Sequence, residues 1–484
     1  MNSTPSTDPT TAAVAELTTE MTGDPITALV ERTSPIDFKH LAEMHLEGAL
    51  VNAQGEPRNP THKEALVMIV DHFLNALNER GSGLAKINGL PHCYQKDHWR
   101  PVDGEFLERK MGEYSQRLGH RVSDSRHFRF RGDLRAQLES HCQILDALPG
   151  SAAVNFKNGT LRLNGQSPIL TEHRIEDGFT YVLSFDYDPG ATSPLFDAYF
   201  ERVLPDPECR QVIMEFLGWI FLRDLKLEKM LVLHGNGHNG KSVFFDITRA
   251  LLGDSNVSSL SLASLRTPEK RLPLLGKLLN YGSEIGGNVS PDIIKLASSG
   301  EPLEFRRLYG DLFTSSDYAR LAFNSNTLPT ETEITEGYFR RFLIIPFEQT
   351  ISDEEKDPSL AGKIIGSELP GVMNRVMVGM RKVKSQRKFS ACSKSDQCLA
   401  AYRHESDTVA QFLKDENWAS DGIERTAKTD FFHAYTDYCH ESGFQPLGKK
   451  NFAARLKSEH RIGETKSGSV RYWLIRQQEN DSEI

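Results

Sequence analysis

Residues 235–242, Gly-Asn-Gly-His-Asn-Gly-Lys-Ser, place glycines, a lysine and a serine at the spacing of a phosphate-binding loop. An apolar stretch, residues 230–234, predicts a strand before the loop, and residues 243–252 predict a helix after it. Glycines let backbone N–H groups wrap phosphates, and the helix N-terminus favours their charge. Lys241 would reach the β- and γ-phosphates, and Ser242 would supply an oxygen to Mg²⁺. We therefore expect ATP and Mg²⁺ as cofactors, bound by Gly235, Asn236, Gly237, His238, Asn239, Gly240, Lys241, Ser242 and Val243.

Two later strands end in polar residues that suit the same reaction. Residues 277–281, Lys-Leu-Leu-Asn-Tyr, predict a second strand that leads to Glu284, which follows Lys241 by 43 positions. A carboxylate there can polarise the attacking water and help hold Mg²⁺. Ser283 stands where many such motors have Asp, so Glu284 is the single acidic candidate. Residues 319–326 predict another strand that ends at Asn326, whose amide would sense the γ-phosphate.

An arginine pair, Arg340 and Arg341, lies just before the apolar strand expected at 342–347. No acid is evident as a partner within the chain. Such a pair suits an arginine finger donated to a neighbouring subunit, which stabilises charge during phosphoryl transfer. The alternative is a surface salt bridge for each guanidinium.

A helix followed by a hairpin is expected between residues 295 and 310, and the hairpin tip carries Arg306, Arg307 and Tyr309. Two guanidiniums beside an aromatic ring offer a single DNA strand both charge and a stacking face. We expect these three residues to bind single-stranded DNA.

The C-terminal residues predict helices at 430–442 and 449–459 and a β-wing at 465–475. Residues 441–476 hold eight Lys or Arg against three Glu, a local charge of +5 in a chain of −9. This is the footprint of a duplex-binding module. A solvated basic surface and a docking site for an acidic partner remain open. The candidate DNA contacts are Lys449, Lys450, Arg455, Lys457, Lys466 and Arg471.

Composition sets the class of protein. The 484 residues are 38% hydrophobic and 25% charged, as in soluble globular proteins. The net charge of −9 excludes a uniformly basic DNA binder. Six cysteines show no C-x-x-C spacing, which favours free thiols in a reducing compartment. With no signal peptide and no long apolar run, we expect a cytoplasmic location in the host cell and no membrane partner.

The chain divides into five expected parts. They are a disordered tail at 1–35, an α+β domain with a helical collar at 36–204, the motor at 205–350, a helical linker with a basic end at 351–400, and a winged helix at 401–484. Within them we expect a helix at 38–50, a helix begun by a Thr61–Glu64 capping box, a hairpin turning at Asn158-Gly159, and helices across 195–229.

Several of these segments together resemble the superfamily 3 helicases, and most closely the phage and plasmid primase–helicase family that includes the poxvirus primase–helicase. In the motor the segments are 235–242, 283–284, 299–310, 326–329 and 339–341, a span of 107 residues. Residues 154–161, 185–189 and 216–220 are similar to the domain before the family's motor, and 408–412, 435–439 and 446–452 to its C-terminal module. Relatives often carry a larger primase domain in front, so priming by this chain is not expected.

The resemblance implies an AAA+-like α/β motor that works as a ring, usually a hexamer, with 3′→5′ movement. It implies a DNA helicase and replication initiator of a mobile element, with single-stranded DNA, origin duplex, and a host or element-encoded primase and polymerase as partners. The alternative is a nucleotide-switched protein that binds or melts an origin without processive unwinding. A packaging ATPase is a lesser alternative.

Overall fold

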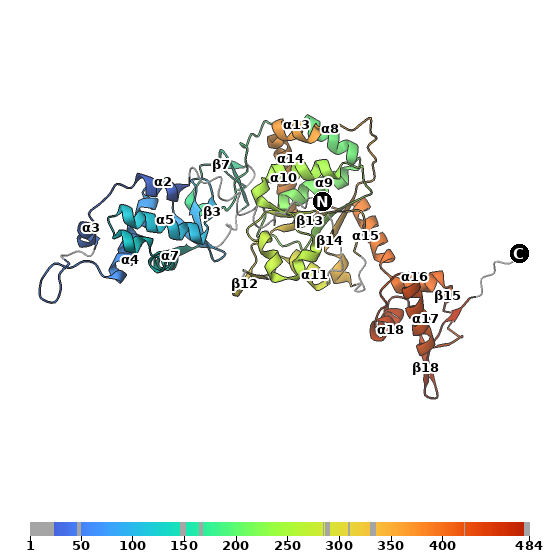
Figure 1. The fold of residues 1–484 in the computed structure, drawn as a ribbon. Helices are drawn as coiled ribbons and strands as arrows, with labels where there is room; N and C mark the ends of the chain where they lie inside the picture. Colours follow the sequence, from blue (N-terminus) through green and yellow to red (C-terminus); the bar gives the residue numbers. More distant parts are fainter. Residues whose placement is uncertain are drawn as a thin grey trace, which may run out of the picture. The chain divides into compact units, whose positions relative to one another are not determined.

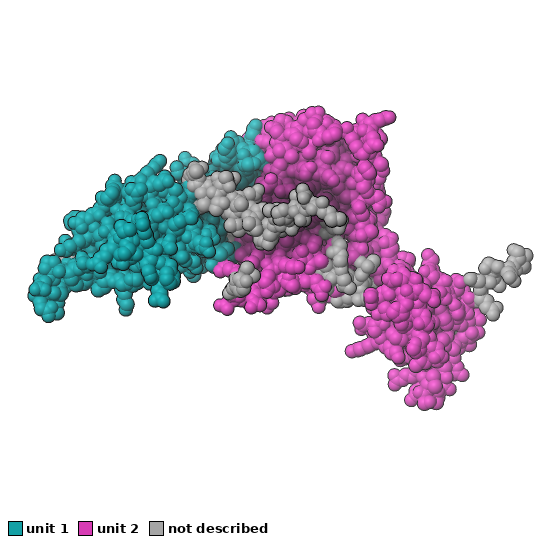
Figure 2. All heavy atoms as spheres, in the orientation of Figure 1, with its two compact units in different colours: residues 1–188 teal, residues 189–484 magenta. Residues whose placement is uncertain are grey.

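A computed structural model describes residues 24–45, 50–145, 152–163, 168–283, 285, 291–307, 310–329, 335–420 and 422–478. The chain forms two compact units, residues 1–188 and 189–484, shown in teal and magenta in Figure 2. The division falls before the helix at 194–203, whereas the sequence placed a domain boundary after residue 204. No helix in the described ranges is long and apolar enough to cross a membrane.

Unit 1 combines a helical layer with two small sheets. One sheet has the order β3-β2-β1-β4 and the other β5-β6-β7. The helices are α2 (Pro25–Arg32), α3 (Phe38–His45), α4 (His62–Asn78), α5 (Gly104–Arg117), α6 (Val122–Arg126) and α7 (Phe128–His141). The strands are β1 (Leu84–Ile87), β2 (Leu90–Tyr94), β3 (Trp99–Pro101), β4 (Gln143–Ile144), β5 (Ala153–Phe156), β6 (Gly159–Arg162) and β7 (Ile169–Thr171).

The expected disordered tail is wrong for its last residues. Asp24 caps α2 by accepting a hydrogen bond from the Thr27 N–H. Ile26, Leu29 and Val30 are buried in the core that α4, α5 and α7 also build. Three apolar side chains on one helix face bury enough surface to offset the ordering of a short segment. Residues 1–23 of the tail lie outside the described residues.

The capping box that the sequence predicts at the start of α4 is confirmed. The Thr61 hydroxyl accepts from the Glu64 N–H while the Glu64 carboxylate accepts from the Thr61 N–H, so both halves of the capping box form. Arg58 also pairs with Glu64 at 2.7 Å. The expected helix at 38–50 is α3 in its first part, and residues 46–49 lie outside the described residues.

The β5–β6 hairpin turns one residue earlier than expected. Phe156 pairs with Gly159, so the turn residues are Lys157 and Asn158. Gly159 begins β6 instead, at φ +142°, where a Cβ would lie 2.4 Å from the Thr171 carbonyl oxygen. The Asn158 side chain accepts from the Tyr187 N–H at 2.9 Å, which fixes the turn from the side.

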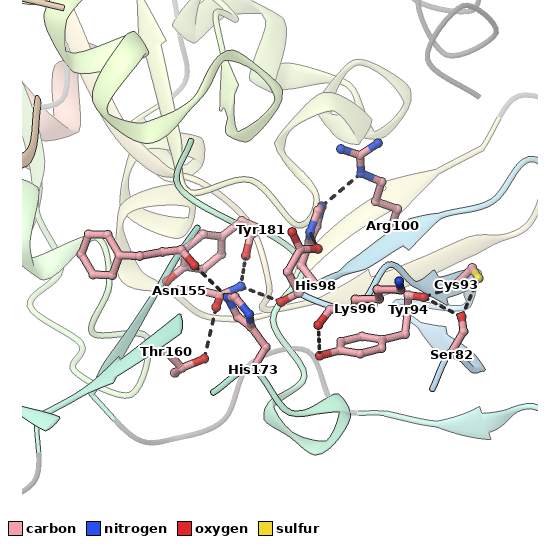
Figure 3. Close-up of polar contacts among 12 residues, drawn as sticks. Ser82, Cys93, Tyr94, Lys96, His98, Arg100, Asn155, Thr160, His173 and Tyr181 are labelled. Atoms are coloured by element: carbon pink, nitrogen blue, oxygen red, sulfur yellow. Dashed lines mark hydrogen bonds and ion pairs between the residues drawn. The ribbon is translucent and has the colours of Figure 1, made fainter. Parts of the chain in front are cut away.

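A buried asparagine ties this hairpin to two other segments (Figure 3). The Asn155 amide donates to the carbonyl oxygens of Asp97 and Tyr181, each at 2.8 Å, and accepts from the Thr160 hydroxyl at 3.1 Å. Asn155 has no exposed surface, so each bond is made away from water. The similarity of residues 154–161 to the family therefore falls on a structural network.

Unit 2 is built on a five-stranded parallel sheet in the order β14-β8-β13-β10-β9. The strands are β8 (Met230–His234), β9 (Val257–Ser258), β10 (Leu279–Gly282), β13 (Arg320–Ser325) and β14 (Phe342–Pro346). Figure 1 shows α9, α10 and α14 on one side of the sheet and α11 on the other. This is the α/β arrangement with a parallel sheet that the sequence predicts.

The helices of this sheet domain are α8 (Pro194–Val203), α9 (Pro207–Trp219), α10 (Lys241–Leu252), α11 (Pro291–Ser299), α12 (Glu336–Phe339), α13 (Leu360–Ser367), α14 (Leu369–Gln386) and α15 (Ser393–Glu405). Helical structure across 195–229 is only partly correct, because α9 ends at Trp219. The helices α9 and α14 approach closely at two glycines. A Cβ on Gly218 would lie 2.4 Å from the Met380 nitrogen, and one on Gly379 would lie 2.4 Å from the Met214 carbonyl group.

The C-terminal segment holds α16 (Thr408–Asp415), α17 (Lys428–Glu441), α18 (Lys449–Ser458) and an antiparallel sheet of order β16-β18-β17. Its strands are β16 (Thr426–Ala427), β17 (Glu464–Ser467) and β18 (Val470–Trp473), and β15 (Trp418–Ala419) pairs with β19 (Arg476–Gln477). The core includes Phe412, Phe431, Tyr435 and Phe452.

The helix α15 runs through the expected boundary at 400/401. Tyr402 is buried in the core of the parallel-sheet domain and its ring meets that of Phe339 at 5.3 Å. Its hydroxyl shares a 2.9 Å hydrogen bond with that of Tyr338 and donates to the Pro329 carbonyl oxygen at 2.6 Å. The sheet domain therefore extends to the end of α15.

Candidate nucleotide-binding site

The carboxyl ends of three neighbouring parallel strands meet at one edge of the sheet. Ser325 of β13 pairs with His234 of β8, and Gly282 of β10 pairs with Phe323 of β13. The segments that follow, at 235, 326 and 283, therefore leave the sheet side by side. In open α/β sheets ligands bind at this edge. The fold thus brings together the glycine loop and the two strand ends that the sequence selected.

The loop between β8 and α10 depends on its glycines. Gly240 has φ +84°, and a Cβ there would lie 2.6 Å from the Val203 side chain. A Cβ on Gly235 would lie 2.4 Å from the Phe347 carbonyl oxygen. Asn239 is buried and donates to the carbonyl oxygens of Asn236 and Phe347 at 2.7 and 3.1 Å. These contacts fix the conformation of the loop on its buried side. At Gly237 the loop is open, because nothing lies within 4 Å of a Cβ built there.

Lys241 lies at the N-terminus of α10 and points back into the loop. Its ammonium donates to the Gly235 carbonyl oxygen and lies 3.4 Å from the Asn326 amide oxygen. Only 8% of the residue is exposed, and burial lowers the pKa of its ammonium. Two residues that the sequence assigned to one reaction therefore meet, although 85 positions separate them.

The remaining loop residues face outwards. Asn236, Gly237, His238 and Ser242 are exposed, and Val243 is half-buried. His238 adopts φ +62°, a left-handed conformation unusual for a residue with a side chain, and the Ile351 N–H donates to its carbonyl oxygen at 2.8 Å. Backbone groups and the Ser242 hydroxyl are thus open to a ligand, as phosphate and metal binding require.

The sequence predicted a helix near residue 195 but gave no sign that this helix supports the loop. Tyr199 of α8 donates its hydroxyl to the Gly240 carbonyl oxygen at 2.8 Å, and burial raises the pKa of that phenol. The Phe200 ring stacks on Phe244 of α10 at 5.8 Å. In the sequence Tyr199 appears only as one of several apolar positions of a helix, so no local signal marks its role.

The acidic candidate Glu284 lies outside the described residues. Ser283, directly before it, is exposed at the carboxyl end of β10. Below that end, the fully buried Tyr281 donates to the Asn324 amide oxygen at 3.0 Å and meets the Phe245 ring at 4.6 Å. Among the residues that the structure describes, no cluster of three His, Cys, Asp or Glu could hold a metal ion.

The expectation that Arg340 and Arg341 lack an acidic partner in the same chain is wrong. Glu228 accepts from both, at 3.1 Å from Arg340 and in a closer contact with Arg341. The Arg341 side chain is 9% exposed and that of Arg340 is 57% exposed. Glu228 lies in the loop before β8, at φ +56°. Because it is far from the arginine pair in the sequence, no local pattern identified it as their partner. Arg340 is therefore the more accessible of the two guanidiniums.

The arginine pair lies at the opposite end of the sheet from the glycine loop. The Met230 N–H at the start of β8 donates to the Arg341 carbonyl oxygen at 2.8 Å, whereas the loop follows the other end of this five-residue strand. At about 3.3 Å per residue the two ends are roughly 16 Å apart. Neither arginine reaches the loop of its own chain in this arrangement.

The hairpin formed by β11 (Leu303–Arg306) and β12 (Leu312–Ser315) is present as expected. Arg306 is half-exposed, lies 3.6 Å from Glu269 and donates to the Gly310 carbonyl oxygen at 3.3 Å. The Arg307 guanidinium lies over the Phe313 ring at 5.0 Å. Both cations therefore have local contacts that brace the hairpin. Tyr309 lies outside the described residues.

Five of the six C-terminal cations are exposed: Lys449, Lys450, Lys457, Lys466 and Arg471. The sixth, Arg455, contradicts its expected role as a DNA contact. It is 8% exposed and pairs with Asp407 at 3.2 Å and Glu459 at 3.3 Å. Lys457 pairs with Glu464 at 2.7 Å, and Lys449 lies over the Phe432 ring at 5.3 Å.

Sequence models of three families match the chain. Residues 63–218 match the family described as D5 N terminal like, and residues 404–479 match that described as Poxvirus D5 protein-like. Residues 233–341, which hold the glycine loop and the arginine pair, match a family of unknown function, DUF5906. The three matches follow the order of the expected parts and cover most of the described chain.

Two viral relatives are similar to part of the chain. "Putative helicase L207/L206" of Acanthamoeba polyphaga mimivirus is 22% identical over 209 residues, which are 40% of this chain and 21% of that protein. "Putative helicase 121R" of Invertebrate iridescent virus 3 is 24% identical over 245 residues, 46% of this chain and 25% of that protein. The matched part thus spans a quarter or less of these relatives.

Among solved structures, the apo C-terminal region (305–718) of NrS-1 is similar over 83% of this chain and 98% of that one, with 10% identity and a TM-score of 0.48. A second structure of the same region, the A form, gives the same values.

Proposed function

Since the chain belongs to the D5-like helicase family, we propose that it is an ATP-dependent DNA helicase and replication initiator of a mobile genetic element. Its AAA+-like motor domain would move on single-stranded DNA as a ring. One observation carries the proposal: the Lys241 ammonium and the Asn326 amide meet at 3.4 Å at the carboxyl edge of a parallel sheet. Such an edge, with a glycine loop and a helix N-terminus, is where nucleotides bind.

The loop fits a nucleoside triphosphate and Mg²⁺. Bound there, the metal would neutralise charge on the transferring phosphoryl group. The exposed loop amides would hold phosphate oxygens, and Lys241 would exchange the Gly235 carbonyl oxygen for a phosphate. Ser242 would contribute its hydroxyl to the metal, Glu284 would orient and deprotonate water, and Asn326 would sense the γ-phosphate. The hydrogen bonds of Asn239 and Tyr199 would keep the backbone of the loop in place beneath the phosphates.

An arginine from a neighbouring subunit would complete the site. The pair at the amino end of β14 lies about 16 Å from the loop of its own chain. Arg340, 57% exposed, is the better donor because Arg341 is buried against Glu228. Arg340 would leave Glu228 when the next subunit approaches. The family resemblance implies six subunits, with Arg306, Arg307 and Tyr309 facing the DNA strand and movement from 3′ to 5′.

The C-terminal segment would act as a winged helix that recruits the ring to origin duplex. The order α16, α17, α18 and the β17–β18 hairpin supports this assignment, and Lys450, Lys466 and Arg471 are its exposed cations. A chain that ends at Ser406 keeps Tyr402 in the motor core. We expect this shortened chain to retain ATP hydrolysis and ring formation but to lose affinity for origin duplex. Unchanged duplex binding would instead favour docking of an acidic protein partner.

A strand-displacement assay tests the whole proposal. The substrate is a forked duplex with one labelled strand, and the control is Glu284→Gln, which should bind ATP without turnover. We expect displacement by the wild-type chain that requires ATP, and none by the variant. DNA-stimulated hydrolysis without displacement would replace the motor by a nucleotide-switched protein that marks or melts an origin.

A further inference from the structure

The junction of α6 and α7 in unit 1 carries a group of exposed cationic and aromatic side chains. Arg121 directly precedes α6, Arg126 ends it, and His127, Phe128 and Arg129 lie at the start of α7. All five residues are exposed. We call them the α6–α7 patch. It lies far in the sequence from the motor hairpin and the C-terminal module, where the function proposed above places its DNA contacts.

Phe128 is the centre of this patch and is 65% exposed. The His127 ring lies 5.0 Å from its ring at a tilt of 34°, and the Arg129 guanidinium lies 5.7 Å from its centroid. A single exposed phenylalanine is common on protein surfaces. Here, however, the planar side chains of the preceding and the following residue, His127 and Arg129, lie close to the ring. Part of the ring surface is still open to a further planar ligand.

The patch is fixed to the core by the next aromatic residue. Phe130, two positions after Phe128, points about 200° away around the helix. It is buried and stacks on His120 at 4.7 Å with an angle of 6° between the rings. His62 meets the same ring at 5.5 Å. Since Phe130 anchors the first turn of α7, Phe128 is presented outwards on a firm base.

The guanidiniums of the patch differ from others in the same unit. Arg58, Arg135 and Arg162 each pair with a carboxylate. Among the residues that the structure describes, Arg121, Arg126 and Arg129 take part in no ion pair. The one acid within the stretch, Asp124, is half-buried and accepts from the Ser123 hydroxyl at 3.2 Å. Within the described part of the chain, these three guanidiniums are therefore positive charges that no carboxylate pairs with.

We infer that the α6–α7 patch is a second binding site for single-stranded DNA, in which a base stacks on Phe128 and Arg121, Arg126 and Arg129 contact the flanking phosphates. A single strand is the ligand that uses both properties, because its bases are free to stack and its backbone attracts arginine. In duplex DNA the faces of the bases are already stacked on one another, so the exposed ring would add nothing. This inference rests on the proposed function: the site would hold the same single strand on which the helicase moves, at residues that do not belong to the motor domain.

The first experiment measures the binding of a labelled 20-nucleotide single strand to the full chain without nucleotide, by fluorescence anisotropy. Phe128→Leu keeps an apolar side chain but removes the ring, and we expect it to weaken binding about fivefold or more, since stacking of one base is worth that much. Phe128→Tyr should restore binding. Ile144→Ala, at a position 79% exposed in the same unit, is the control and should bind as wild type.

The second experiment measures the salt dependence of the same binding. Each phosphate contact of a single strand contributes about 0.7 to the slope of log Kd against log salt. Arg126→Ala with Arg129→Ala should therefore lower that slope by roughly 1.4. Lys157→Ala with Arg174→Ala removes two exposed charges from the β5–β7 region and should leave the slope unchanged. A folding defect would lower the active fraction without changing the slope.

These outcomes separate the patch from the motor. If Phe128→Leu and the double arginine variant bind the single strand as wild type does, the patch is not a DNA site, whatever the motor does. If they weaken duplex and single strand equally, stacking is excluded and the inference fails. Loss of single-strand affinity with unchanged basal ATP hydrolysis supports it. Photocrosslinking of an iododeoxyuridine strand to the peptide containing Phe128 would support it directly, even if the chain unwound no DNA.

Discussion

The edge of the parallel sheet and the C-terminal helices hold their functional groups in different ways. At the sheet edge, Lys241 is buried, bonded to the loop backbone and aimed by a helix N-terminus. In the C-terminal segment, Lys450, Lys466 and Arg471 are exposed, so their contribution to the proposed duplex binding would be a sum of charges. One substitution should therefore be decisive at the sheet edge and graded in the C-terminal segment.

The largest effect is expected for Lys241→Ala. The ammonium lies between the Gly235 carbonyl oxygen and the Asn326 amide oxygen. Its loss should abolish measurable ATP hydrolysis, because an aligned electrostatic group at the reacting phosphates is removed. Phosphate release under saturating ATP measures this, with the exposed Lys388→Ala as control. Near-normal turnover would show that no single side chain is decisive at the sheet edge.

The next effect concerns the arginine pair. Arg340→Ala should lower hydrolysis by roughly a thousandfold, as loss of an arginine finger does. Mixing it with Lys241→Ala chains should recover part of the activity, since hybrid interfaces join an intact loop to an intact Arg340. Hydrolysis is measured against mixing ratio in oligomers shown to contain both chains. No recovery at any ratio would remove the finger from Arg340. Arg341→Ala tests the remaining candidate and would leave Glu228 paired with Arg340 alone.

A smaller effect separates two cations of α18. Arg455→Ala would leave Asp407 buried without its guanidinium, although the Val409 and Ala410 N–H groups still donate to it. We expect the free energy of unfolding to fall by about 2–3 kcal/mol, which is below the usual range for a broken buried ion pair. Lys450→Ala should change stability by less than about 0.5 kcal/mol. It should instead lower the slope of log duplex affinity against log salt by roughly 0.9.

Urea unfolding of the full chain and duplex binding at several salt concentrations distinguish the two variants. A stable Arg455→Ala chain with a reduced salt slope would return Arg455 to the DNA surface.

The smallest effect concerns pH at the sheet edge. Burial lowers the pKa of His234, and the Lys241 charge lowers it further. The folded chain therefore binds this proton less well than the unfolded chain, whose imidazole pKa is about 6.5. Stability linked to His234 is present above that pH and is lost as pH falls towards the lower folded value. His234→Gln should thus show a smaller drop in melting temperature between pH 7.5 and 5.5 than wild type. An equal drop would assign the pH dependence to other groups.

Local signals in the sequence predicted the elements well where they are self-contained. The Thr61–Glu64 capping box begins α4 as expected, because its bonds lie within one turn. The glycine loop lies between a strand and a helix, as its spacing requires. Apolar side chains on α2 were overlooked because three buried positions are few against a polar tail, and only the neighbouring helices explain their burial.

Partners distant in the sequence could not be predicted. Glu228 precedes the arginine pair by more than a hundred residues, and Asp407 lies well before Arg455, so no local pattern links them. The sequence placed Tyr402 in the C-terminal domain, whereas its contacts with Tyr338 and Phe339 place it in the core of the parallel-sheet domain. Charge counting fails for the same reason, since it cannot tell a buried ion pair from an exposed cation.

The sequence by itself determined the class of chemistry: the spacing of the loop residues, the polar ends of the following strands and the order of the parts. These properties are carried by short stretches whose geometry is set by backbone conformation. Only the tertiary structure decided that Lys241 meets Asn326, that Arg341 is buried while Arg340 is exposed, and that Phe128 faces outwards while Phe130 does not. Burial and pairing depend on which segments pack together, and packing is a property of the whole fold.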